Sequence, residues 1–298
     1  MNVFRIKINP SGGDADLSDT FQYCLDNNVL GIGWDVHDEL SATRNWTEYE
    51  EKAMQRYDNI NPVEYIKNNV AEDDLVWTRG VGDEHAGKHF LARIISGWEY
   101  YDPSLVANGQ RYGVENIFRC ASIYEVEADQ VPGKVVSSFN GRGNVVQRVS
   151  GKHILEYSKY MWNQFQKFYP IDKSNMTLFD MLDAEEAEDI LFLYLQYKGW
   201  RVIPHSRKGS TMKFEFLAKH LTTGELAYTQ VKIGDTEINR EQYKSGRWFL
   251  WQLNEHYTGT DADNVTCITR NEIKDFIESG EKWLPGWLNN KRNSFHFE

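Results

Sequence analysis

An acidic side chain, a hairpin turn and a polar–x–lysine triplet follow one another in the last third of the sequence. Glu215 lies between two phenylalanines, residues 222–224 form a Thr-Thr-Gly turn, and Gln230 and Lys232 follow on the next expected strand. Successive side chains of a strand alternate between its two faces, so Gln230 and Lys232 share a face. We therefore expect a carboxylate, an amide and an ammonium group to converge on one spot.

Such a combination is suited to the hydrolysis of a phosphodiester. Carboxylate and amide oxygens from Glu215 and Gln230, with the main-chain carbonyl of Val231, are the oxygen ligands that Mg²⁺ accepts. Lys232 could orient or deprotonate the attacking water and offset charge in the transition state. The alternative is a solvated hairpin face on which Glu215 and Lys232 form a cross-strand ion pair.

A helix expected at about 184–197 carries a further acid. Asp183 and Glu186 have the N-cap and N3 spacing of a capping box. Glu188 lies four residues before Phe192 and shares a helix face with it. A carboxylate at the edge of an apolar face is costly unless it is paired or binds a metal. The alternative is that Glu188 is an ordinary carboxylate near the start of the helix, where it interacts favourably with the helix dipole.

The elements around these residues indicate an α/β domain, since a helix precedes several closely spaced strands. Along the strand that contains Glu215, alternation places this carboxylate on the face opposite Phe214 and Phe216. A late helix is expected at 271–278. The expected strands cover residues 201–204, 213–219, 226–233, 249–253 and 265–269.

The distribution of charge matters more than the total. The net charge is −11, which by itself argues against a nucleic-acid partner. Residues 1–150 account for −9 of it and residues 151–298 for −2. Between residues 198 and 220 the only acid, Glu215, lies among the cations Lys198, Arg201, Arg207, Lys208, Lys213 and Lys219. We expect Arg207, Lys208 and Lys213 to contact phosphate.

Length and composition favour a two-domain protein. The chain has 298 residues and is 41% hydrophobic, which is enough for two cores. No apolar run reaches membrane-spanning length and the N-terminus lacks a signal-peptide core, so no membrane partner is expected. The cysteines, Cys24, Cys120 and Cys267, are far apart and form no CxxC pair, which fits a reducing cytoplasm.

The first part of the chain reads as a small barrel or curved sheet. Short strands with glycine turns are typical of such folds. We expect one domain at residues 1–150, a linker helix within 151–175 and a second domain at 176–298. The expected strands of the first part are 3–8, 29–34, 74–79, 89–98 and 112–126, and its helices are 17–27 and 46–70, the latter broken at Asn61-Pro62.

The order of helix acid, strand acid, hairpin and Gln-x-Lys resembles the PD-(D/E)xK nuclease superfamily, most closely its Mrr-like restriction endonucleases. The likeness spans residues 187–232. It implies Glu188 as the helix glutamate, Glu215 in place of the strand aspartate, Gln230 where Asp or Glu is usual, and Lys232 as the catalytic lysine. It also implies Mg²⁺ or Mn²⁺ bound by Glu188, Glu215 and Gln230. The neutral Gln230 lowers the negative charge at the metal.

The first part resembles the PUA-like group, especially EVE-type modules that accompany restriction nucleases. The likeness rests on the segments 31–34, 73–77, 90–94 and 97–100. It implies a curved β-barrel that holds a flipped-out modified base in an aromatic pocket, where stacking contributes about 1–3 kcal/mol per base. The implied base-binding residues are Trp34, Trp77 and Trp98, with Arg79 and Tyr100 behind them. The alternative is that these aromatic side chains are core residues.

Together the two resemblances imply a metal-dependent, type IV-like endonuclease that restricts modified foreign DNA, with modified cytosine as the expected base. A homodimer is expected, because one such site cuts one strand at a time. Two alternatives stay open. One is a nucleic-acid-binding defence protein with an inactive nuclease fold, and the other is an RNA-directed nuclease.

Overall fold

The computed structural model divides into two compact units, Met1–Asp172 and Lys173–Glu298. It describes residues 1–10, 15–36, 43–100, 112–140, 144–171, 177–207, 214–280, 282–295 and 297. Helix α6 (Lys152–Phe165), expected in a linker, belongs to the first unit. It packs on strands β1 (Val3–Ile6) and β4 (His89–Ile94). The linker prediction misses this because the buried face of α6 is interrupted by polar residues.

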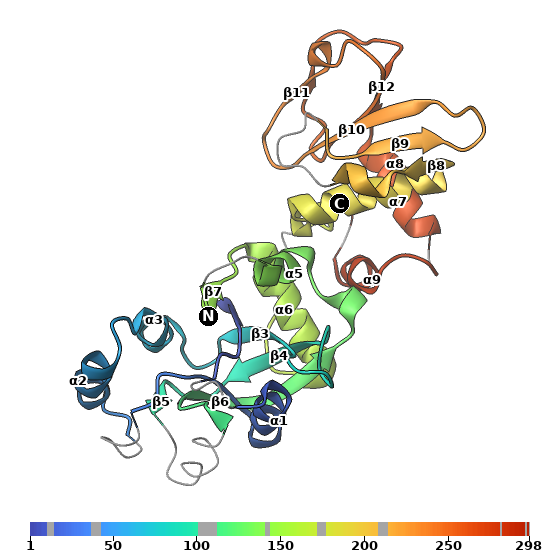
Figure 1. The fold of residues 1–298 in the computed structure, drawn as a ribbon. Helices are drawn as coiled ribbons and strands as arrows, with labels where there is room; N and C mark the ends of the chain where they lie inside the picture. Colours follow the sequence, from blue (N-terminus) through green and yellow to red (C-terminus); the bar gives the residue numbers. More distant parts are fainter. Residues whose placement is uncertain are drawn as a thin grey trace. The chain divides into compact units, whose positions relative to one another are not determined.

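The first unit is built on a curled sheet (Figure 1). Its strand order is β2-β6-β4-β3-β1-β7, with β5 paired to β6. Strands β1 and β3 are parallel and the other pairs antiparallel. A bridge between Asn9 and Ile32 brings the chain after β1 back to β2, so the sheet curls into a half-barrel. The remaining strands are β2 (Val29–Ile32), β3 (Leu75–Arg79), β5 (Glu99–Tyr100), β6 (Asn116–Val126) and β7 (Val146–Arg148).

Helices pack on this sheet, and α1 has clear signals at both of its ends. Asp16 caps α1 by accepting a hydrogen bond from the Asp19 amide at 3.0 Å, and Asn28 ends it in the left-handed conformation. The long helix expected at 46–70 is two helices, as the Asn61-Pro62 pair predicts. The helices are α1 (Leu17–Asn27), α2 (Trp46–Arg56), α3 (Asn61–Asn69), α5 (Gly133–Asn140) and α6, with a 3₁₀ turn η1 (Ala128–Gln130).

The second unit contains a five-stranded sheet in the order β14-β12-β10-β9-β8. Strand β10 is antiparallel to β9 and parallel to β12, and β12 is parallel to β14. A small parallel pair, β11 with β13, lies apart from it. The strands are β8 (Trp200–Val202), β9 (Leu217–His220), β10 (Leu226–Lys232), β11 (Ile238–Asn239), β12 (Arg247–Gln252), β13 (Tyr257–Thr258) and β14 (Val265–Ile268).

Helix α7 packs on β8 and β10 and also contacts α8 (Figure 1). The capping box of Asp183 and Glu186 at the start of α7 is confirmed by reciprocal hydrogen bonds of 3.0 and 2.8 Å. Helix α9 was not predicted, because glycine and three asparagines are weak helix formers. The helices are α7 (Ala184–Tyr197), α8 (Arg270–Ser279) and α9 (Gly286–Ser294), with 3₁₀ turns η2 (Phe179–Met181), η3 (Pro204–Arg207) and η4 (Arg240–Gln242).

Among the described residues, no helix combines the length and the apolar character needed to cross a bilayer. The three cysteines are free, and Cys24 and Cys120 are buried in the first unit. Burial raises the pKa of the Cys24 thiol to about 12. This thiol is therefore held in its neutral form and packs as a small apolar side chain.

Candidate functional site

Glu215, Gln230 and Lys232 meet on one face of the second unit's sheet. The side-chain nitrogen of Gln230 donates a hydrogen bond to Glu215 Oε1, and Lys232 Nζ lies 3.6 Å from the same oxygen. Gln230 is 8% exposed, whereas the side chain of Lys232 is 40% exposed. The expected alternation along β10 therefore brings the three groups together, with the amide inside and the ammonium group open to solvent.

Glu188 joins this group from α7. Burial, followed by the negative charge of Glu215, raises the pKa of Glu188 to about 7, while Arg207 acts in the opposite direction. The charge of Glu215 acts on Glu188 only if the two side chains lie near one another. The site therefore combines two neighbouring carboxylates with an amide and one ammonium group.

The raised pKa of Glu188 predicts a gain in stability when its charge is removed. The folded chain holds a proton that the unfolded chain releases between the ordinary pKa of 4.5 and about 7, so stability falls as pH rises through this window. We expect Glu188→Gln to raise the melting temperature of the metal-free protein at pH 8, with little effect at pH 4. Thermal unfolding by circular dichroism measures this, with Glu225→Gln, an exposed carboxylate of the same unit, as control. A lower melting temperature for Glu188→Gln at pH 8 would contradict it.

The backbone that carries Glu215 is irregular. Regular strand pairing in β9 begins only at Leu217, although the Glu215 amide still donates to the Thr229 carbonyl at 2.9 Å. The Thr229 hydroxyl accepts a hydrogen bond from the Phe216 amide at 3.1 Å and donates one to the Phe216 carbonyl at 2.8 Å. A fully buried threonine side chain thus takes the place of a regular strand partner beside Glu215.

This irregularity overturns one prediction. Glu215 was expected to face away from both Phe214 and Phe216, but the two rings lie on opposite sides. Phe216 packs against Phe192 of α7 with ring centroids 5.9 Å apart, whereas Phe214 packs against Tyr228 at 5.4 Å. Strict alternation fails here because the hydroxyl of Thr229 interrupts the ladder.

Thr229 is accordingly expected to position Glu215. Thr229→Val keeps the shape of the side chain but leaves the buried amide and carbonyl of Phe216 without these partners, at a cost of about 1–3 kcal/mol. We expect lower stability in urea titration together with weaker Mn²⁺ binding by calorimetry. Thr229→Ser keeps the hydroxyl and is the matched control. Equal Mn²⁺ affinity in Thr229→Val and the wild type would show that Glu215 does not depend on this bond.

A buried glutamine organises the segment that follows Lys232. Gln252 is the parallel register partner of Lys232 and is fully buried. Its amide nitrogen donates to the carbonyls of Gly234 and Thr236 at 2.8 and 3.1 Å, and its oxygen accepts from the amides of Asn254 and His256 at 2.7 and 2.9 Å. Sequence reasoning missed this residue, because one glutamine at a strand end carries no distinctive signal.

The expected phosphate contacts are only partly described. Arg207 donates to Asp189 and its guanidinium lies 5.1 Å from the ring centre of Phe192. Its charge is thus partly neutralised by an acid of α7. Lys208 and Lys213 lie outside the residues that the structure describes.

The donor set fits a hard divalent cation. Glu188 and Glu215 concentrate negative charge, and their oxygens are of the kind that Mg²⁺ prefers. Gln230 now presents its nitrogen to Glu215, so holding a cation through its oxygen requires rotation of the amide. Among the described residues, no group of three or more His, Cys, Asp or Glu side chains is placed to hold a metal, and this site itself offers two carboxylates.

Three of the expected base-binding residues, Trp77, Trp98 and Tyr100, are core residues of the first unit. Trp77 is fully buried and its indole donates to the Ser158 hydroxyl of α6 at 3.0 Å. Tyr100 is also fully buried and its hydroxyl donates to Asp35 at 2.9 Å. Neither of these two rings has a face open to a base, so the prediction is wrong for both. Their β-strands point them inward, which single-sequence alternation could not decide.

Trp98 is 7% exposed and is linked to Trp34 through one buried amide. The Trp98 indole donates to Asn116 Oδ1 at 3.0 Å, and the amide nitrogen of Asn116 donates to the Trp34 carbonyl at 3.3 Å. Trp34 is only half-buried and has a φ of 71°, a strained conformation for a bulky residue. Sequence reasoning missed Trp46, whose ring lies 5.1 Å from that of Trp98.

Arg79 does not join these tryptophans. It is exposed and its guanidinium lies 5.7 Å from the ring centre of Phe139 in α5. The expected placement of Arg79 behind the aromatic pocket is therefore wrong. Arg79 ends β3, and the strand direction carries it to the α5 side of the sheet.

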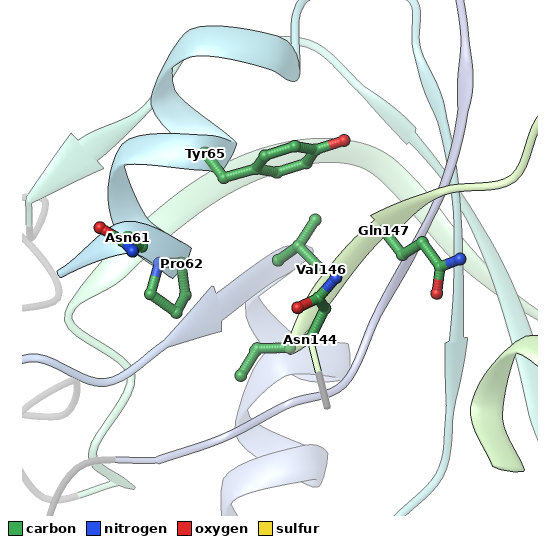
Figure 2. A pocket seen from close by; sticks show the side chains of 7 residues that line it. Asn61, Pro62, Tyr65, Asn144, Val146 and Gln147 are labelled. Atoms are coloured by element: carbon green, nitrogen blue, oxygen red, sulfur yellow. The ribbon is translucent and has the colours of Figure 1, made fainter. Parts of the chain in front are cut away.

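A pocket of the first unit, of about 190 Å³, lies between α3 and β7 (Figure 2). The buried guanidinium of Arg5 fixes the β7 side by donating to the carbonyl of Asn144 at 2.5 Å and to Gln147 Oε1 at 3.1 Å. None of the expected base-binding residues lines it. The lining residues are Asn61, Pro62, Tyr65, Asn144, Val145, Val146 and Gln147.

Comparison with known proteins gives no relative for this chain. No family model, no curated protein and no solved structure matches it. The functional argument therefore rests on the residues themselves and on their geometry.

Proposed function

We propose that this chain is a metal-dependent endonuclease that hydrolyses phosphodiester bonds in foreign DNA carrying modified bases. The observation that carries the proposal is the convergence of Glu188, Glu215, Gln230 and Lys232, which come from a helix and two adjacent chain segments. A structural ion pair would need Glu215 and Lys232 alone. It would not explain why Glu188, a second and half-buried carboxylate, lies within coulombic range of Glu215.

Each residue has a definite task in this proposal. Glu188, Glu215 and the Gln230 oxygen would hold Mg²⁺ or Mn²⁺, which when bound stabilises negative charge on a phosphoryl oxygen. The exposed ammonium group of Lys232 donates to the attacking water or to a phosphate oxygen and offsets charge in the transition state. Thr229 and Gln252 hold the backbone on either side of these groups.

The proposed role of the first unit is to sense the base. Trp34 and Trp98 support this role because they share Asn116 and because Trp34 is partly open to solvent. A base held between aromatic rings gains about 1–3 kcal/mol from stacking. A DNA partner that is cut on both strands further implies a homodimer.

A cleavage panel tests the proposal. Full-length protein is incubated with Mg²⁺ or Mn²⁺ and with DNA containing cytosine, methylcytosine or hydroxymethylcytosine. We expect cleavage of a modified DNA that stops when EDTA removes the metal. Absence of cleavage with either metal on every DNA would overturn it.

One observation favours the second candidate, a nucleic-acid-binding protein with an inactive nuclease fold. The side-chain nitrogen of Gln230 donates a hydrogen bond to Glu215, so the amide presents a donor at the position where a metal ligand presents an oxygen. Specific binding of modified DNA without cleavage would support this candidate. An RNA arm of the same panel tests whether RNA is the substrate.

A further inference from the structure

We propose that a row of aromatic side chains beside the active site, Phe214, Tyr228, Tyr243 and Trp248, stacks on an unpaired base next to the scissile phosphate. The inference rests on the proposed nuclease function and deepens it. It assigns single-stranded or locally unpaired nucleic acid as the substrate class. We call these four residues the aromatic row.

Each ring of the aromatic row contacts the next, in the spatial order Phe214, Tyr228, Trp248, Tyr243. Phe214 packs on Tyr228 with ring centroids 5.4 Å apart, and Tyr228 stacks on Trp248 at 4.9 Å and 24°. Tyr243 meets Trp248 edge to face at 4.7 Å. Trp248 is 8% exposed and is the buried member of the row. The other three rings are half-buried and keep part of their surface in solvent.

Strand register places this row next to the active site. Tyr228 pairs with Trp248, and Gln230 pairs with Leu250 two positions along the same strands. Side chains two residues apart share a face, so the row and the site lie on one surface of the sheet. The negative charge of Glu215 also contributes, after burial, to a raised pKa of Tyr243, which agrees with their proximity.

The row is held rigidly. Gly246 has a φ of 77°, and a Cβ there would lie 2.9 Å from the ring of Tyr228, so this glycine allows the chain to pass against the ring. The Trp248 indole donates to the Ser245 carbonyl at 2.8 Å, and Asn264 donates to the Tyr243 carbonyl at 2.9 Å. A preorganised ring loses little conformational entropy when a base stacks on it.

The aromatic row is suited to binding a base and not only the sugar–phosphate backbone. Aromatic faces stack on any base, but only one that is not already stacked in a duplex. Lys232, on one side of the row, and the exposed Lys244, next to Tyr243 in the chain, provide cations for the flanking phosphates. A base held here would place its neighbouring phosphodiester close to Glu215 and Lys232.

The experiment measures binding and cleavage separately. Binding uses the full chain with Lys232→Ala and a single-stranded oligonucleotide carrying 2-aminopurine, whose fluorescence falls on stacking. We expect quenching on binding, and Tyr243→Leu or Tyr228→Leu in this background to raise Kd about 5- to 150-fold, the equivalent of one lost stacking contact. Tyr243→Phe keeps the ring and should bind like the parent. Tyr197→Leu removes an exposed ring of α7 and is the matched control.

Several outcomes would overturn the inference. One is equal affinity for the parent and both leucine variants, each checked for an unchanged melting temperature. Another is tighter binding of a fully paired duplex than of the single strand. In both cases metal-dependent cleavage by the wild type, lost in Lys232→Ala, would leave the proposed nuclease function intact. Failure of the wild type to bind or cut any nucleic acid would overturn both.

Discussion

Replacement of Lys232 by alanine is expected to lower the rate of metal-dependent cleavage about 10²–10⁴-fold, the usual contribution of a positioned acid–base group. The ammonium group lies 3.6 Å from Glu215 and is open to solvent, where an attacking water and a phosphate oxygen can reach it. Single-turnover cleavage of the modified DNA found in the panel measures the effect. DNA affinity should change little, because one exposed cation supplies a small part of phosphate binding.

The control for this prediction is Lys219→Ala, which removes an exposed cation of β9 on the same sheet. It should cut at the wild-type rate. Lys232→Arg keeps the charge but replaces a compact ammonium group with a planar fork, so it should recover little activity. Cleavage by Lys232→Ala at the wild-type rate would show that this site does not catalyse the reaction.

Replacement of Lys291 by methionine is expected to lower the free energy of unfolding by about 3–5 kcal/mol, the cost of leaving one partner of a buried ion pair alone. Lys291 Nζ lies 2.6 Å from Glu186 Oε2 and donates to the Met181 carbonyl at 2.7 Å. Both side chains are buried. Urea unfolding of the full chain, monitored through the second unit's tryptophans, measures the loss.

The pH dependence of this loss has a definite sign. Burial raises the pKa of Glu186 even beside Lys291, and removal of the lysine raises it further. The variant should therefore lose less stability at pH 5, where Glu186 can be protonated, than at pH 8. The double variant Lys291→Met with Glu186→Gln should regain most of the loss, because glutamine at N3 preserves the capping box. An exposed control, Lys219→Met, should leave stability unchanged.

Much of the second unit could be predicted from its sequence. The capping box fixed the start of α7, and the alternation of residues 226–233 predicted β10 to within one residue. The same alternation predicted that Gln230 and Lys232 point to one place. These are local properties, because they depend on neighbours within one turn or one strand.

The first unit shows where local reasoning stops. A curled sheet was expected and is present. However, the sequence analysis assigned one role, base binding, to five residues with similar local sequence. The structure places these five residues in different environments. Trp77, Trp98 and Tyr100 are buried and Arg79 lies beside Phe139, so Trp34 alone of the three tryptophans is partly open to solvent. Burial depends on which distant elements pack on a strand, and no window of sequence contains them.

The sequence by itself determined the identity and order of the acid, amide and lysine groups and the strand that presents two of them. Only the tertiary structure decided that Glu188 of α7 is half-buried within coulombic range of Glu215, so that burial first and the charge of Glu215 second raise the pKa of Glu188 to about 7. It also decided that Thr229 breaks the ladder at Phe216, which turns Phe214 toward Tyr228 and extends the aromatic row. The physical reason is that electrostatic coupling and stacking act through space, between residues that only the folded chain brings together.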